Sequence, residues 1–141
     1  MSTLLNLTVN STFNTFPFVQ ILFSAFFAIL FLQSGIDKIT DRKGNLVWLT
    51  GHFANSPLAR MVPLLLTTIT IFEVLAGITS ALAVLEVCIY RSFNTALIGT
   101  SLSAVSLLML FFGQRLAKDY AGAGGLVPYF LVAVINLYIL V

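Results

Sequence analysis

The sequence predicts an all-α integral membrane protein, a bundle of four transmembrane helices with a short interfacial helix in the first loop. Composition gives the first reason: the 141 residues are 59% hydrophobic and 9% charged, with a mean hydropathy of +1.03. A soluble domain carries about 25% charged residues, so this chain lacks the polar residues that would cover a water-facing surface. Length gives the second reason, because four separate apolar stretches are each long enough to cross a bilayer as a helix.

The chain begins with a predicted polar tail, residues 1–14, which is rich in Ser, Thr and Asn. The first span is predicted over residues 17–36, with Pro17 in the first helical turn, where proline is tolerated. Gly35 lies near the end of this span and allows another helix to approach closely. Gln33 is a polar residue near the membrane boundary.

A short helix lying in the interface is predicted over residues 44–55. Gly44 and Asn45 predict the break that precedes it, and residues 55–57 (Asn-Ser-Pro) predict its end. Apolar residues fall on one face of this helix and two ring-bearing residues on the opposite face: Leu46, Leu49 and Phe53 against Trp48 and His52.

The second span, residues 61–85, holds one carboxylate, Glu73, near its middle. An ionised side chain at that depth costs at least a few kcal/mol unless it is paired, hydrated or protonated. Small and polar residues lie three, four or seven positions from it, on the same helical face: Thr70, Ala76, Gly77 and Ser80. This pattern predicts that Glu73 faces the interior of the bundle, and an intramembrane carboxylate indicates a functional site.

The third span is predicted over residues 95–112, with Gly99 and Ser103 at helical spacing for close packing. The glycines at residues 122–125 predict a break in the helix after it. The fourth span is predicted over residues 126–141, with Pro128 in its first turn.

Basic residues are distributed unevenly between the loops. The first and third loops hold six of the seven Lys and Arg residues, at positions 38, 42, 43, 60, 115 and 118, and the second loop holds Arg91. The positive-inside rule then places the first and third loops in the cytoplasm. An even number of spans puts both termini on the opposite side, outside the cytoplasm.

Several classes of site are excluded by the residues that the chain lacks. A single cysteine, Cys88, excludes an internal disulfide and a cysteine-based metal cluster. A single histidine, His52, excludes a bis-histidine haem site, so no metal site is predicted. The glycines at 122–125 follow no predicted strand and therefore form no dinucleotide loop. A net charge of +2 does not indicate nucleic-acid binding.

Two motifs resemble those of the DoxX/DoxD family of small four-helix membrane proteins, in its Bacteroidetes-type branch. The segment FLQSGIDKI carries Phe31, Gly35 and Lys38, and FEVLAG carries Glu73 and Gly77. The resemblance implies a multi-pass protein of the bacterial inner membrane. Some DoxD relatives are membrane subunits of a thiosulfate:quinone oxidoreductase, so the resemblance also implies a quinone as a candidate ligand. The chain lacks an Arg early in the first span and a His in the third, so no catalytic residue is implied.

The first functional hypothesis is an accessory subunit of an inner-membrane complex, respiratory or otherwise redox-linked, that packs against partner helices and lipid. The chain contains no water-soluble catalytic domain, so we expect no enzymatic activity of its own and no covalently bound cofactor. Five small residues are predicted to pack the helices: Gly35, Gly77, Ser80, Gly99 and Ser103.

Two alternatives remain open from the sequence. One is a quinone-interacting subunit of a membrane oxidoreductase in which Glu73 handles protons; the predicted headgroup or lipid site consists of Glu73, Gln33, Lys38, Trp48 and His52. The other is a small oligomeric transporter. A purely structural interpretation stands beside both, in which Glu73 is a protonated acid bonded to a neighbouring helix and Lys38, Trp48 and His52 are interfacial anchors.

Overall fold

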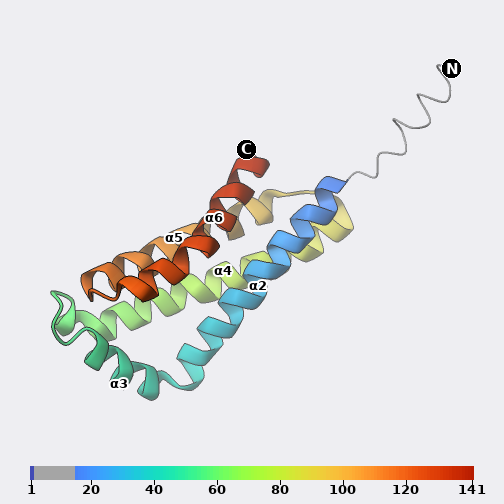
Figure 1. Ribbon diagram of the computed structural model, residues 1–141. Coiled ribbons are helices and arrows are strands. Elements are labelled where there is room, and N and C mark those ends of the chain that lie inside the picture. The colour runs from blue at the N-terminus through green and yellow to red at the C-terminus, as the bar shows by residue number, and fades with distance from the viewer. Residues whose placement is uncertain (2–14) are drawn as a thin grey trace.

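The computed structural model describes Met1 and residues 15–141, and the predicted tail otherwise lies outside the described residues. The described part is helical and contains no strand. In chain order its helices are α2 (Thr15–Thr40), α3 (Arg42–His52), the short 3-10 helix η1 (Ala59–Met61), α4 (Val62–Tyr90), α5 (Asn94–Leu116) and α6 (Tyr120–Leu140). Figure 1 shows the four long helices with α3 across one end of the bundle, and this arrangement confirms the predicted fold class.

Four segments are long and apolar enough to cross a membrane: α2, η1 with α4, α5 and α6. Their surfaces carry large apolar side chains that are exposed, among them Ile29, Leu64 and Leu131. In water such an exposed apolar surface would lead to aggregation, whereas in a bilayer lipid covers it. The chain is therefore a multi-pass membrane protein, and these side chains contact lipid.

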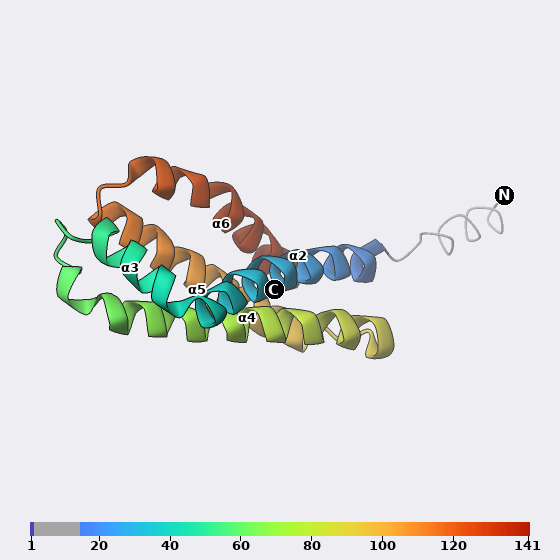
Figure 2. The same ribbon diagram turned by 90° about the horizontal axis from the view of Figure 1, so that it is seen from below.

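Helix α4 is the centre of the arrangement, because it packs against α2 on one side and α5 on the other. Helix α6 makes most of its helix contacts with α5 and, as Figure 2 shows, leans away from α4. We call the end of the bundle that carries α3 the α3 end. An apolar cluster joins α2, α4, α5 and α6 within the bundle: Phe27, Phe31, Ala76, Leu107 and Ala133.

Three glycines lie where helices approach most closely. A Cβ atom on Gly35 would lie 2.7 Å from Val74 Cγ2, and one on Gly77 would lie 2.7 Å from the backbone nitrogen of Leu32. A Cβ atom on Gly99 would lie 2.8 Å from Ser80 Oγ. Larger residues would push the helices apart, so glycine sets the α2–α4 and α4–α5 spacing. The fifth predicted packing residue, Ser103, is buried on α5 and donates to the carbonyl oxygen of Gly99 at 2.8 Å.

Two predicted helix breaks are wrong. Gly44 lies inside α3, and the Asp41 carboxylate caps that helix by accepting from the Gly44 N–H at 3.1 Å. Asp119 caps α6 in the same way, accepting from the Gly122 N–H at 2.8 Å, so the glycines at 122–125 lie inside α6. An aspartate cap contributes about 1 kcal/mol, which offsets the helix penalty of a glycine. Consequently Pro128 lies in the interior of α6 and not in its first turn.

The predicted element bounds were also too short or displaced. Helix α2 continues to Thr40, four residues beyond the predicted end of the first span, and α4 continues to Tyr90. Arg91 then ends α4 with a left-handed backbone, φ 53°. The interfacial helix ends at His52, three residues before the predicted end at residues 55–57.

Candidate functional site

A cavity of about 330 Å³ lies at the α3 end, between α3, α4 and α5. Most of its wall is apolar, and the apolar lining includes Leu49, Phe53, Leu66, Ile69, Leu110 and Phe112. Helix α3 covers this side of the bundle because the chain bends at Asp41 and then reverses direction between His52 and Ala59 (Figure 1). The cavity is therefore formed by an interfacial helix laid over two membrane spans.

Polar side chains reach the same cavity from three elements. Lys38 comes from the end of α2, Asn45 and His52 come from α3, and Gln114 comes from the last turn of α5. A few converging polar groups in an otherwise apolar hollow are typical of a small-molecule site. This composition suits a molecule with one polar end and one apolar end.

One face of α3 supplies the polar and the apolar lining together. Asn45, Trp48, Leu49 and His52 stand at positions i, i+3, i+4 and i+7, which share one side of a helix. Leu49 and Phe53 therefore line the same cavity as Trp48 and His52. The predicted placement of these groups on opposite faces is wrong, since adjacent residues such as Trp48 and Leu49 differ by only about 100° around a helix.

Side chains hold α3 in place at both of its ends. Near its C-terminal end, His52 Nε2 lies 2.6 Å from Gln114 Oε1, and Trp48 stacks on the imidazole with ring centroids 4.6 Å apart. This contact joins the end of α3 to the last turn of α5. At the beginning of α3, Arg42 donates to Thr67 Oγ1 on α4 at 2.7 Å.

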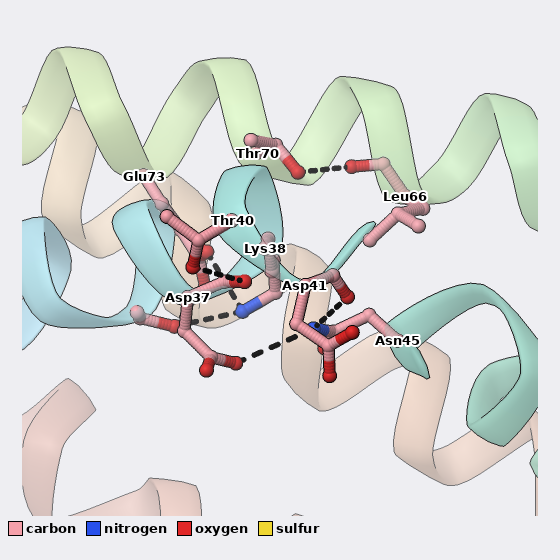
Figure 3. A network of polar contacts seen from close by, with 9 residues as sticks. Asp37, Lys38, Thr40, Asp41, Asn45, Leu66, Thr70 and Glu73 are labelled. Atoms are coloured by element: carbon pink, nitrogen blue, oxygen red, sulfur yellow. Dashed lines mark hydrogen bonds and ion pairs between the residues drawn. The ribbon is translucent and has the colours of Figure 1, made fainter. Parts of the chain in front are cut away.

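Glu73 lies behind the cavity, with 1% of its side chain exposed. The Lys38 ammonium stands 2.9 Å from Glu73 Oε2, and the Ser34 hydroxyl donates to Glu73 Oε1 at 3.1 Å. The same ammonium donates to Ser34 Oγ at 2.7 Å, which closes a three-residue network. Figure 3 shows Lys38 and Glu73 of this network. The contact between Lys38 and Oε2 is an ion pair whose angles fall outside hydrogen-bond geometry.

Helix packing brings this ion pair together. Gly35 allows the α2 backbone to approach α4 at Val74, the residue that follows Glu73. Lys38 lies one turn beyond Gly35 on α2, and so it reaches the carboxylate. The sequence placed Lys38 and Glu73 in one predicted site without predicting a direct contact, and the structure pairs them as an ion pair.

The corner between α2 and α3 fixes the polar end of the cavity. Asn45 Nδ2 donates to the backbone oxygen of Asp41 at 2.9 Å and lies 3.3 Å from Asp37 Oδ2 (Figure 3). Both aspartates are exposed to solvent. Thr70, one turn from Glu73, donates to the Leu66 carbonyl at 2.5 Å and takes no part in the network.

The five residues predicted for a headgroup site do not all meet. Lys38, Trp48 and His52 line the cavity, and Glu73 is connected to it through Lys38. Gln33 is exposed on the surface of α2 and lies apart from the site. Three contributors were missed by sequence reasoning: Ser34, Asn45 and Gln114. The four-residue spacing of Ser34 and Lys38 could have indicated that both lie on one face of the first helix. The contribution of Gln114 could not be predicted, because it depends on the position of α3 relative to α5.

The fold and the cavity define a class, a four-span membrane protein with an interfacial helix over a partly polar cavity. Among the described residues, no three His, Cys, Asp or Glu side chains come together in a way that could hold a metal ion. In comparisons with known proteins, the chain matches no family model, no curated protein and no solved structure.

Proposed function

We propose that this protein is an integral-membrane binding protein whose cavity holds the head of an amphipathic molecule. The observation that carries the proposal is the cavity itself, which combines apolar walls with Lys38, Asn45, His52 and Gln114. The apolar part of the molecule would lie along Leu66, Leu110 and the neighbouring wall, and its tail would extend into lipid.

A quinone is the redox-linked candidate for this ligand. Its ring carbonyls are acceptors that suit the ammonium of Lys38, and Trp48 offers an aromatic face beside it. Glu73, held by Lys38 and Ser34, would then handle protons at the headgroup. The resemblance to the DoxX/DoxD family supports this candidate, and a partner subunit would supply the redox centre.

We further propose that the protein lies in a bacterial inner membrane with the α3 end in the cytoplasm and both termini outside. Support comes from the six Lys and Arg residues in the first and third loops, against one in the second. The cavity then opens at the cytoplasmic interface, where an amphipathic ligand can enter from the inner leaflet.

The binding proposal is tested with Trp48, which is the only tryptophan and lines the cavity. Decyl-ubiquinone added to the protein in nanodiscs should quench its fluorescence with a saturable dependence. Leu110→Phe narrows the cavity, and overpacking of about 1–3 kcal/mol should weaken binding by about tenfold. Leu108→Phe is the matched control, because Leu108 is exposed on the same helix and does not line the cavity. Quenching that is unsaturable, or equal in all three proteins, would contradict the proposal.

A second function, accessory subunit of a membrane complex, is favoured by α6. Only 17% of its apolar window is buried within the chain, against 33–39% for the other three spans. Its outer face carries Leu131, Val134, Ile135 and Tyr138, which suit either lipid or a partner helix. Purification in mild detergent followed by mass spectrometry tests this role. Recovery with other subunits at fixed stoichiometry supports it, and recovery of the chain alone contradicts it.

A further inference from the structure

The ammonium of Lys38 is shared between the buried carboxylate and the cavity. It carries three N–H donors. One donates to Ser34 Oγ at 2.7 Å, and the ion pair with Glu73 Oε2 spans 2.9 Å. Lys38 also lines the cavity, with 16% of its side chain exposed, so a ligand head can reach the same ammonium. Glu73 and a ligand therefore compete for one cation.

Glu73 depends on that cation. Among the described residues, Lys38 is the only basic group within 4 Å of the Glu73 carboxylate. Of the other ionisable groups at this end, His52 on α3 contacts Gln114 and lies 3.8 Å from Asp119. On α5, Arg115 stands over the Tyr120 ring at 4.6 Å. The remaining charged groups near the corner are exposed: Asp37, Asp41, Arg42 and Lys43.

The lining favours an anionic head. Lys38 and His52 line the cavity, and no Asp or Glu is among its lining residues. Six of the seven Lys and Arg residues and four of the five Asp and Glu residues belong to segments at the α3 end, so the charge at this end is +2 and the approach to the cavity is weakly positive. Three carboxylates lie behind the lining: Asp37 beside Asn45, Asp119 3.8 Å from His52, and Glu73. Glu73 opposes an anion most directly, because it is already paired with the Lys38 ammonium.

We propose that the cavity binds an amphiphile with an anionic head, that this head replaces Glu73 as the partner of Lys38, and that Glu73 takes up one proton. The inference rests on the proposed binding of an amphipathic molecule, and it names an anionic head in place of the neutral quinone ring. One anion enters from the membrane, one proton from water bonds to the Glu73 carboxylate, and Lys38 keeps its charge throughout. The buried site is neutral before and after binding.

The proton is required because two carboxylate-like charges cannot share one buried ammonium. An uncompensated charge in the bundle is strongly unfavourable, so protonation of Glu73 accompanies entry of the anion. Ser34 can remain bonded to Glu73 after this change, since its hydroxyl can accept from the protonated carboxyl as well as donate. Anion affinity and proton affinity are thereby linked.

The test compares two brominated probes in phosphatidylcholine nanodiscs. A bromoalkanesulfonate stays ionised across the pH range, and a bromoalkanol of equal chain length is its neutral control. Bromine quenches Trp48 when a probe occupies the cavity. We expect the Kd of the sulfonate to rise about tenfold for each unit by which the pH is raised. This slope applies in the pH range where Glu73 is protonated in the bound state and ionised in the free state. The Kd of the alkanol should not change, and a weakly buffered sample should show one proton taken up per sulfonate bound.

Variants assign the proton to Glu73. In Glu73→Gln the sulfonate should bind with a Kd that does not depend on pH and without proton uptake. Lys38→Met should lose sulfonate binding and keep alkanol binding. His52→Gln is the control, because His52 is the other ionisable group in the cavity. In this variant the Kd of the sulfonate should change, but its dependence on pH should remain. A slope that survives in Glu73→Gln, or disappears in His52→Gln, overturns the proposal.

The outcomes separate this inference from the function on which it rests. If neither probe quenches Trp48 in a saturable way, both the proposed binding function and this inference are wrong. If the alkanol saturates and the sulfonate does not, the inference alone is wrong. If Glu73→Gln fails to fold, proton uptake by the wild-type protein decides: one proton per sulfonate supports the inference, and none overturns it.

Discussion

At the residue scale, the ion pair of Lys38 and Glu73 connects the buried interior of the bundle with the cavity, because Glu73 is buried and Lys38 lines the cavity. Burial removes both groups from water, and their mutual attraction with the bonds of Ser34 compensates for that loss. Such a pair contributes little to net stability while complete, but each half is costly alone. The sequence identified the buried carboxylate from its position in a span. It did not identify the cation, because the pairing depends on how α2 crosses α4 at Gly35.

A double-mutant cycle on this pair gives a direct prediction. Lys38→Met alone, or Glu73→Met alone, should lower the free energy of unfolding by about 3 kcal/mol. The remaining group loses its partner, so Lys38 is left as an unpaired charge and Glu73 must stay charged or take up a proton at neutral pH. The double variant should lose much less than the sum of the two. Unfolding in mixed detergent micelles at neutral pH measures all four proteins. Additive losses would mean that the two side chains do not interact.

The helices were predictable from hydropathy, whereas their ends and packed faces were not. Asp41 and Asp119 cap the N-termini of α3 and α6 with their side chains. These caps stabilise the first helical turns, which contain glycines that the sequence pattern assigned to helix breaks. Small residues behaved differently according to context. A Cβ atom on Gly77 would meet the Leu32 backbone, while one on Gly124 would have nothing within 4 Å. Spacing alone does not separate these two cases, because it does not say which face meets a neighbour.

This contrast predicts opposite effects of alanine at the two glycines. Gly77→Ala should destabilise the protein by about 1–3 kcal/mol, since its Cβ would lie 2.7 Å from the Leu32 backbone nitrogen and α2 must move away. Gly124→Ala should be neutral or stabilise by up to about 1 kcal/mol, because alanine is the better helix former and open space surrounds it. Thermal unfolding of both variants in the same detergent makes the comparison. Equal effects would show that close packing at Gly77 does not set the α2–α4 distance.

At the scale of the whole molecule, composition was sufficient to predict a four-span membrane bundle. Apolar length defines a span, and no detail of packing is needed for it. The cavity was not predictable, because it forms only when α3 folds back over α4 and α5 and brings Gln114 next to His52. Those two residues are 62 positions apart. The sequence therefore predicted three lining residues of the site (Lys38, Trp48, His52), but it did not predict the apolar lining from α4 and α5 that completes the cavity.

The orientation of the whole molecule can be tested by cysteine labelling in a Cys88→Ala background. Asn94→Cys lies at the start of α5, and Asn55→Cys lies in the segment after α3; both positions are exposed. With six basic residues at the α3 end, a membrane-impermeant maleimide added to intact spheroplasts should label position 94 and not position 55. Position 55 should react only after the membrane is opened. The reverse pattern would place the α3 end outside.

The most direct test of the central claim is to locate a bound amphiphile. A diazirine-bearing alkyl sulfonate is photolysed with the protein in nanodiscs, and the adducts are mapped by mass spectrometry. We predict that adducts concentrate on wall residues such as Leu66, Met109 and Leu110, and that excess unlabelled amphiphile removes them. Adducts spread over exposed positions such as Ile29, Leu64 and Leu131, and unaffected by the competitor, would show only lipid-like contact and would contradict a binding cavity.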